Sequence, residues 1–220
     1  MFNMAFWPTM NFSEHLLFFV TLLVLFSPPA AVAAFATITD RFPPDIQKKV
    51  AKRVARNYFV VMSISIIVGE YVLMILGIST AALMITGGLA VMVVGMPMMI
   101  SGQKQRMVSH EDDVHAVPRA EWETVVSVPM TFPMTIGGAT IAIAISAASN
   151  EIAVVDYGIL ILSAFMMAIV VYLVTYLASN LARRMGGSID ILIRASGIII
   201  VAIAIQILAK GLYGLILIYG

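Results

Sequence analysis

The sequence predicts an all-α polytopic membrane protein. Its six transmembrane helices form two inverted three-helix repeats, and the first and fourth helices are interrupted. Three observations predict this fold. The 220 residues are 61% hydrophobic and only 11% charged, whereas a soluble domain carries about 25% charged residues. Six apolar stretches are long enough to span a bilayer, and helix-breaking residues recur at a constant offset along the chain.

The apolar stretches each approach or exceed the length of about 20 residues that a helix needs to cross the hydrocarbon layer. They cover residues 14–39, 57–77, 80–101, 124–148, 157–179 and 191–218. Within the first stretch, the apolar segment Leu16–Phe26 is followed by SPPAAVAA, which imitates a signal-peptide cleavage site. However, no basic residue precedes it, and Glu14 stands where a signal peptide carries positive charge. We therefore interpret this stretch as the first transmembrane helix.

Basic residues gather in alternate loops. All of them except Lys210 lie in the first, third and fifth loops or, for Arg194, just inside the sixth span. Because basic loops stay in the cytoplasm, this pattern predicts that both termini lie outside. Arg194 follows Asp190 by one helical turn, a spacing that favours an ion pair. We expect a multi-pass protein of the cell (inner) membrane.

An internal repeat appears at an offset of 109 residues, which pairs Gly77 with Gly186, Gly88 with Gly197 and Gly102 with Gly211. The same offset places SPPA at 27–30 on IGGA at 136–139. Residues 1–102 form the first repeat, 103–123 a cytoplasmic loop and 124–220 the second repeat. Since each repeat has an odd number of spans, the two have opposite orientations in the bilayer.

The paired breaks predict a binding site near the midplane, as in transporters that have inverted repeats and discontinuous helices. Proline withholds a backbone donor, while glycine tolerates non-helical angles. Free N–H groups at a half-helix end favour anions, and free carbonyls favour cations. A small zwitterion such as an amino acid presents both charges, so two breaks can bind it without a buried charged side chain.

Four segments carry a resemblance to a known family. They read LFSPPAAVAAFATIT, MITGGLAVMVVGMPMM, VPMTFPMTIGGATIAIAIS and RASGIIIVAIAIQILAKGL. Their order resembles the MarC family, also called the SnatA small neutral amino acid transporters, over residues 16–217. The resemblance implies uptake or exchange of glycine, alanine or similar amino acids coupled to an ion gradient. Family members usually carry breaks like NPIG and GPGA, which are SPPA and IGGA here, so the side-chain contacts do not carry over intact.

The candidate substrate-binding residues surround the two breaks. The hydroxyls of Ser27 and Thr135 can face a ligand or bond carbonyls of their own helix. Gly137 and Gly138 can serve close packing, but their match to the other break favours binding. The full candidate set is Ser27, Pro28, Pro29, Ala30, Thr131, Thr135, Ile136, Gly137, Gly138, Ala139 and Thr140.

Glu70 is an acid within the second span and a candidate for coupling to a proton or sodium gradient. Pairing with Lys210, or snorkelling to the interface, are the alternative interpretations.

Other function classes find little support. The chain has no cysteine, which excludes thiol catalysis and cysteine metal sites. We expect no enzyme activity, cofactor, metal site or nucleic-acid partner, and the sequence does not indicate an oligomeric state. An uncoupled channel or facilitator of the same architecture is the alternative function. The expected partners are a small amino acid, a coupling ion and the lipid bilayer.

Overall fold

The computed structural model describes residues 12–39, 42–101, 131, 135–149, 154–185 and 188–219. Regular structure in these ranges is helical, which confirms the predicted class. The helices are α1 (Phe12–Phe26), α2 (Pro28–Thr39), α3 (Pro44–Leu76), α4 (Thr80–Ser101), α7 (Gly138–Ala148), α8 (Val154–Met185) and α9 (Ser188–Tyr219).

Five stretches of the described part are long and apolar enough to cross a membrane. They are His15–Ala36, Pro44–Leu76, Thr80–Ser101, Asp156–Leu181 and Asp190–Leu217. They match five of the six predicted spans. The sixth is the predicted fourth span, of which α7 forms the second half, while residues 124–130 lie outside the described residues.

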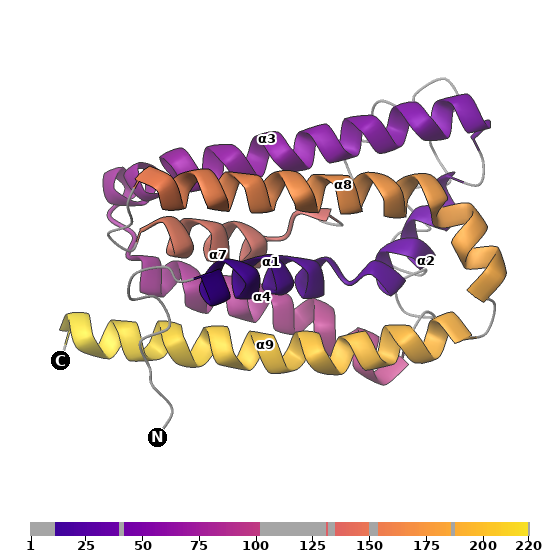
Figure 1. Cartoon of the computed structure of the whole chain (residues 1–220). Helices are drawn as coiled ribbons and strands as arrows, with labels where there is room; N and C mark the ends of the chain where they lie inside the picture. The colour runs from indigo at the N-terminus through magenta and orange to yellow at the C-terminus, as the bar shows by residue number, and fades with distance from the viewer. Residues whose placement is uncertain are drawn as a thin grey trace.

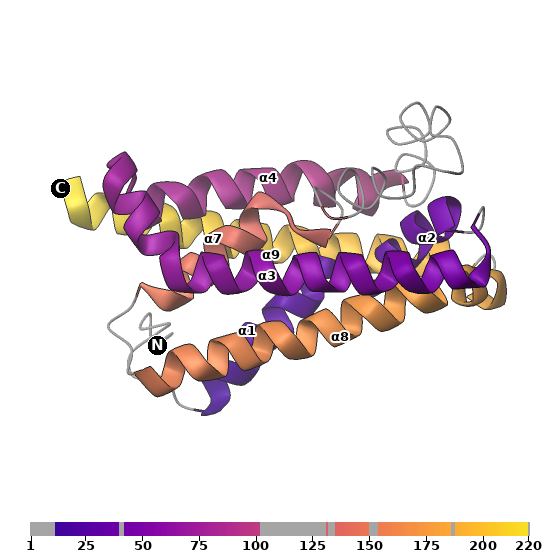
Figure 2. The same ribbon diagram turned by 90° about the horizontal axis from the view of Figure 1, so that it is seen from above.

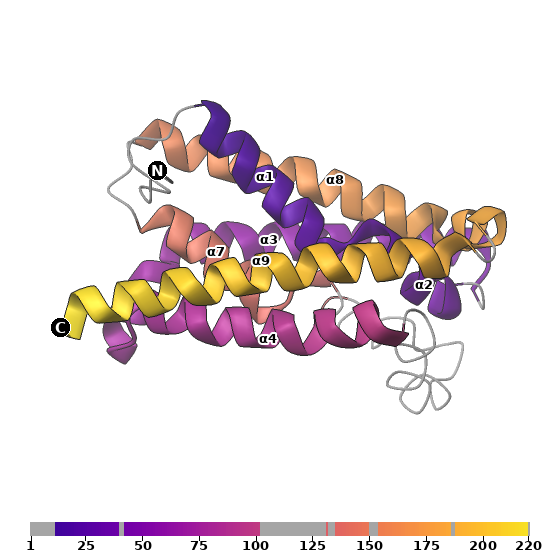
Figure 3. The same cartoon turned by 90° about the horizontal axis from the view of Figure 1, so that it is seen from below.

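The long helices enclose the short ones. In Figure 1, α3 and α8 run along one side and α4 and α9 along the other, with α1, α2 and α7 between them. Figure 2 shows α3 beside α8 from above, and Figure 3 shows α4 beside α9 from below. The start of α1 and the end of α9 lie at the same end of the bundle, which we name the terminal end. The opposite end, where α3 begins and α8 ends, is the basic end.

The first predicted loop is largely helical, which corrects the sequence interpretation. α3 begins at Pro44, where the proline ring suits the first helical turn, and it runs unbroken through Lys48 and Arg56 into the membrane. Val50 and Val54 are buried on one face of this segment while Lys52 is exposed. Charges on the opposite face lowered the average hydropathy, so an amphipathic helix resembled a loop.

Glycines allow α4 and α9 to approach closely. A Cβ added at Gly88 would lie 2.8 Å from Leu208 Cγ, and one at Gly197 would lie 2.5 Å from the main-chain nitrogen of Met99. Small residues serve this purpose in membrane helices generally. Helices α4 and α9 therefore pack tightly against each other beside the short helices.

Candidate functional site

The chain is interrupted between α1 and α2, as the two prolines predict. The residue before a proline is pushed out of the α conformation, and Ser27 adopts a positive φ of 47°. Its N–H still bonds the carbonyl of Val24 at 3.0 Å, and its carbonyl accepts from the N–H of Ala31 at 2.9 Å. Pro28 then begins α2. The helix is therefore interrupted at a single residue, Ser27, and its backbone takes the strained conformation.

The second break precedes α7. Gly137 is extended at φ −92° and ψ 163° and caps the helix that begins at Gly138. These angles are non-helical, as expected for a break, and any residue adopts them, so glycine is not required here for its backbone freedom. The distinguishing feature is open space, because a Cβ added at either glycine would meet no heavy atom of the described, non-adjacent residues within 4 Å. The chain before this break is described only at Thr131 and from Thr135 onward.

The two breaks adjoin the same packed interior. Ala30, after the first break, and Ala139, after the second, belong to one buried cluster. Phe26, Ala31 and Ile136 belong to another. Buried contact of this kind defines a shared core. The structure therefore brings residues from both halves of the chain together at mid-length of the bundle, where Figure 1 shows α1 ending and α7 beginning.

The predicted site residues differ in exposure. Gly138 is exposed and Pro28, Pro29 and Gly137 are half-buried. Irregular backbone at membrane depth is tolerated where it is buried in protein or lines a water-filled cavity, and Gly138 is the one candidate substrate-binding residue that is exposed. The remaining candidates are buried, namely Ser27, Ala30, Thr131, Thr135, Ile136, Ala139 and Thr140.

The hydroxyl of Ser27 does not bond a carbonyl of its own helix, so that alternative interpretation of this residue does not hold. It is buried, with 3% of the residue exposed, and its Oγ has no hydrogen-bond partner. Thr131, by contrast, has a hydrogen-bond partner on another helix: its Oγ1 accepts a hydrogen bond from Asn57 Nδ2 of α3 at 3.3 Å. A buried hydroxyl without a partner is costly, so Ser27 is a ligand-facing candidate.

Tyr58 of α3 is a buried polar residue that the sequence interpretation missed. Only 1% of it is exposed, and its hydroxyl has no hydrogen-bond partner. A tyrosine in an apolar span usually indicates core packing or an interface anchor. The one available signal was its position beside Asn57, where two polar side chains stand between the basic segment and the apolar sequence that follows it.

Contacts with α8 fasten the short helices at both ends of the bundle. At the terminal end, His15 Nε2 of α1 lies 3.4 Å from Asp156 Oδ1. The hydroxyl of the next residue, Tyr157, donates to the carbonyl of Ala148, the last residue of α7, at 3.1 Å. At the basic end, hydroxyl oxygens of Thr39 in α2 and Ser179 lie 3.2 Å apart. Helix α8 therefore holds three of the half-helix ends.

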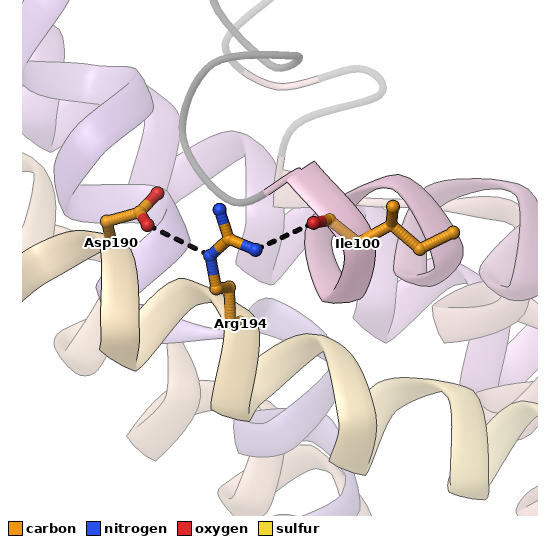
Figure 4. Close-up of polar contacts among 3 residues, drawn as sticks. All are labelled: Ile100, Asp190 and Arg194. Carbon is orange, nitrogen blue, oxygen red and sulfur yellow. Dashed lines mark hydrogen bonds and ion pairs between the residues drawn. The ribbon is translucent and has the colours of Figure 1, made fainter.

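Arg194 anchors α9 to α4 at the basic end, as Figure 4 shows. Its Nε donates to Asp190 Oδ2 at 2.9 Å, which confirms the pair expected from their spacing. A second nitrogen donates to the carbonyl of Ile100 at 2.7 Å. That carbonyl belongs to the last turn of α4, where carbonyls lack helical partners, so Arg194 caps the neighbouring helix.

Glu70 is exposed on α3, within the half of the helix nearest the terminal end. Its coupling role stays a prediction. Among the residues that the structure describes, no group of three or more His, Cys, Asp or Glu side chains is placed to hold a metal ion.

Comparison with known proteins gives one family and several relatives. Residues 12–216 match the model of the MarC family of integral membrane proteins. A UPF0056 membrane protein of Methanocaldococcus jannaschii is 26% identical, over 94% of this chain and 100% of its own. One from Pyrococcus horikoshii is 24% identical over 90% and 94%. The UPF0056 inner membrane protein MarC of Citrobacter koseri is 29% identical over 91% and 94%. No solved structure matches the chain.

Proposed function

Because this chain belongs to the MarC family of integral membrane proteins, we propose that it is a secondary transporter of small neutral amino acids such as glycine and alanine. The solute binds where the helix breaks at Ser27 and Gly137 meet in the core. The single observation that carries this proposal is the pairing of a buried, unpartnered hydroxyl at one break with open space at the other.

The chemistry of the two breaks differs in a way that suits a zwitterion. In a continuous helix the N–H of residue 29 would bond the carbonyl of Leu25, but Pro29 has no N–H. A carbonyl of the first break is thus left for an ammonium group. At the second break the first hydrogen bonds to the Gly137 carbonyl come from Thr140 and Ile141. The N–H groups of Gly138 and Ala139 precede these bonds and favour a carboxylate.

The inverted repeat belongs to the same proposal. Gly88 approaches Leu208, and Gly197 approaches Met99. Adding the repeat offset of 109 to Gly88 gives Gly197, and subtracting it from Leu208 gives Met99. The second contact is therefore the first one with the two helices exchanged. A two-fold axis in the membrane plane relates contacts in this manner, and transporters with such repeats work by rocking one part against the other.

Orientation and coupling complete the proposal. The terminal end faces outward and the basic end faces the cytoplasm of a cell membrane, as the basic loops favour. An ion gradient drives transport, with Glu70 as the coupling candidate and a proton or sodium as the ion. The name of the Citrobacter koseri relative as an inner membrane protein agrees with this location.

Uptake of labelled glycine or alanine into proteoliposomes tests the proposal. Saturable, gradient-dependent uptake is expected, and its absence for all small neutral amino acids would contradict transport of this class. Counterflow separates the carrier from the alternative of an uncoupled channel or facilitator. A carrier accelerates entry of labelled solute when unlabelled solute is inside, whereas an open pore gives no saturable trans-stimulation.

A further inference from the structure

Resting on the proposed function, we propose that the Tyr58 hydroxyl of α3 donates a hydrogen bond to the carboxylate of the bound amino acid. Tyr58 would then be a substrate contact contributed by a continuous helix, in addition to the two broken ones. The inference uses three properties of this residue: its burial, its unpaired hydroxyl and its depth in the bundle.

Burial and the unpaired hydroxyl call for a partner that the folded chain does not supply. Tyr58 is among the largest fully buried side chains, and its hydroxyl has no hydrogen-bond partner. Polar groups buried in protein interiors are nearly always bonded, and phenylalanine would pack in the same space without the penalty. A ligand that enters the interior and accepts a hydrogen bond accounts for the hydroxyl.

The depth of Tyr58 follows from contacts with α8. The edge-to-face contact between Phe59 and Phe165, with ring centres 5.7 Å apart, fixes the alignment of the antiparallel helices α3 and α8. Tyr58 therefore lies near the level of residue 166. The contact between Thr39 and Ser179 aligns α2 with α8, which run in the same direction. Counting back 12 residues from each places Ser27 near the level of residue 167.

Tyr58 and the first break thus lie at the same depth, within about one helical turn. The hydrogen bond from Asn57 to Thr131 brings the chain before the second break to this level as well. Tyr58, Ser27 and Thr131 therefore form one layer, contributed by α3 and by both interrupted segments.

A carboxylate suits the donors in this layer. A tyrosine hydroxyl donates one hydrogen bond, Ser27 offers another, and the N-terminus of α7 adds main-chain N–H groups and a favourable dipole. In the sequence between Arg56 and Arg184, the only lysine or arginine that the structure describes is Arg183, at the end of α8. Neutral donors of this kind bind a carboxylate through hydrogen bonds, with its charge balanced by the ammonium group of the same molecule.

The competing explanation is that the hydroxyl is a tolerated packing defect. Thr175 of α8 provides a matched control for it, because this residue is also fully buried and its Oγ1 also has no partner. It lies about 12 Å closer to the basic end than the break layer, given the rise per residue of a helix. If both hydroxyls are tolerated packing defects, removing either one should leave glycine binding unchanged. If the Tyr58 hydroxyl is a substrate contact, only its removal should weaken glycine binding.

The test compares Tyr58→Phe with Thr175→Val in the full chain, by equilibrium binding of glycine to detergent-purified protein and by thermal denaturation without ligand. Each substitution removes a hydroxyl and retains the shape. A hydrogen bond to a charged group predicts about ten- to hundred-fold weaker glycine binding by Tyr58→Phe. Thr175→Val should bind as the unmodified protein does, and neither variant should have a lower Tm.

Unchanged glycine affinity in Tyr58→Phe would overturn the inference, and so would an equal loss in Thr175→Val, which would indicate an indirect effect of the interior. Glycinamide, which lacks the carboxylate, should compete equally against Tyr58→Phe and the unmodified protein. A loss of glycinamide affinity as large as that for glycine would overturn the assignment to the carboxylate. Failure of the proposed function is separate, since it appears as absence of saturable binding by the unmodified protein.

Discussion

Replacing Gly138 by leucine should abolish solute binding while leaving the protein folded. A Cβ at Gly138 would meet no heavy atom of the described, non-adjacent residues within 4 Å, so the first carbon of the new side chain does not clash with that part of the fold. Residues other than glycine also stabilise helices, by about 0.5–1 kcal/mol at interior positions, and α7 begins at this residue. The free energy of unfolding should therefore stay the same or rise.

The same side chain would occupy the open space before the N-terminus of α7, where we place the carboxylate. Loss of one main-chain hydrogen bond to a charged group and of part of the dipole interaction amounts to about 2–4 kcal/mol. This corresponds to an increase in Kd of roughly thirty-fold to a thousand-fold. Counterflow of labelled glycine in proteoliposomes and thermal shifts with added glycine measure the effect.

Gly158→Leu is the matched control. Gly158 also has nothing within 4 Å of an added Cβ, but it lies in α8 near the terminal end, away from both breaks. This variant should exchange glycine normally. Normal exchange by Gly138→Leu would refute the placement of the solute, and a fall in its Tm relative to Gly158→Leu would refute the reasoning about open space.

Three further substitutions test the packing around the site. Gly197→Ala should lower the free energy of unfolding by about 1–3 kcal/mol, measured by denaturation, because its Cβ would lie 2.5 Å from main-chain nitrogen of α4; unchanged stability would contradict the close approach. Asp156→Asn should accelerate hydrogen exchange in α1, since it removes the charged partner of His15; unaltered exchange would show that the pair does not hold the helix. Arg194→Gln should lower stability by no more than about 1 kcal/mol, because its pair with Asp190 is solvent-exposed, and a larger loss would mean that the bond to Ile100 dominates.

The first break was predictable because its cause is local. Pro28 and Pro29 cannot donate hydrogen bonds, whatever surrounds them, and the residue before them is driven from the helix. The structure adds that the strain falls on Ser27. At the second break the sequence identified the place, and Gly137 is non-helical as expected; its angles are open to any residue, however, and the open space depends on neighbouring helices, which the sequence does not specify.

Tyr58 and the pair of His15 with Asp156 could not be found in the same way. Each owes its interest to the register between helices that are far apart in sequence, which periodicity does not specify. The helical structure of the basic start of α3 was not predicted for a different reason. One face of this segment is charged, and the other face buries Val50 and Val54. Hydropathy averaged over a window combines the two faces and therefore does not reveal such a helix.

The glycines fall into two classes that separate packing from binding. At Gly87, Gly88 and Gly197 an added Cβ would lie 2.5–2.9 Å from an atom of a neighbouring helix; these glycines hold α4 against α7 and α9. At Gly137 and Gly138 an added Cβ would lie within 4 Å of no atom of the described residues other than chain neighbours, so close packing against these residues does not explain the two glycines. Open space before a helix N-terminus can accommodate a small anionic group. In the proposed transport function, water fills this space when no solute is bound, and a solute with a carboxylate gains more there than water does, because the N–H groups and the dipole favour negative charge.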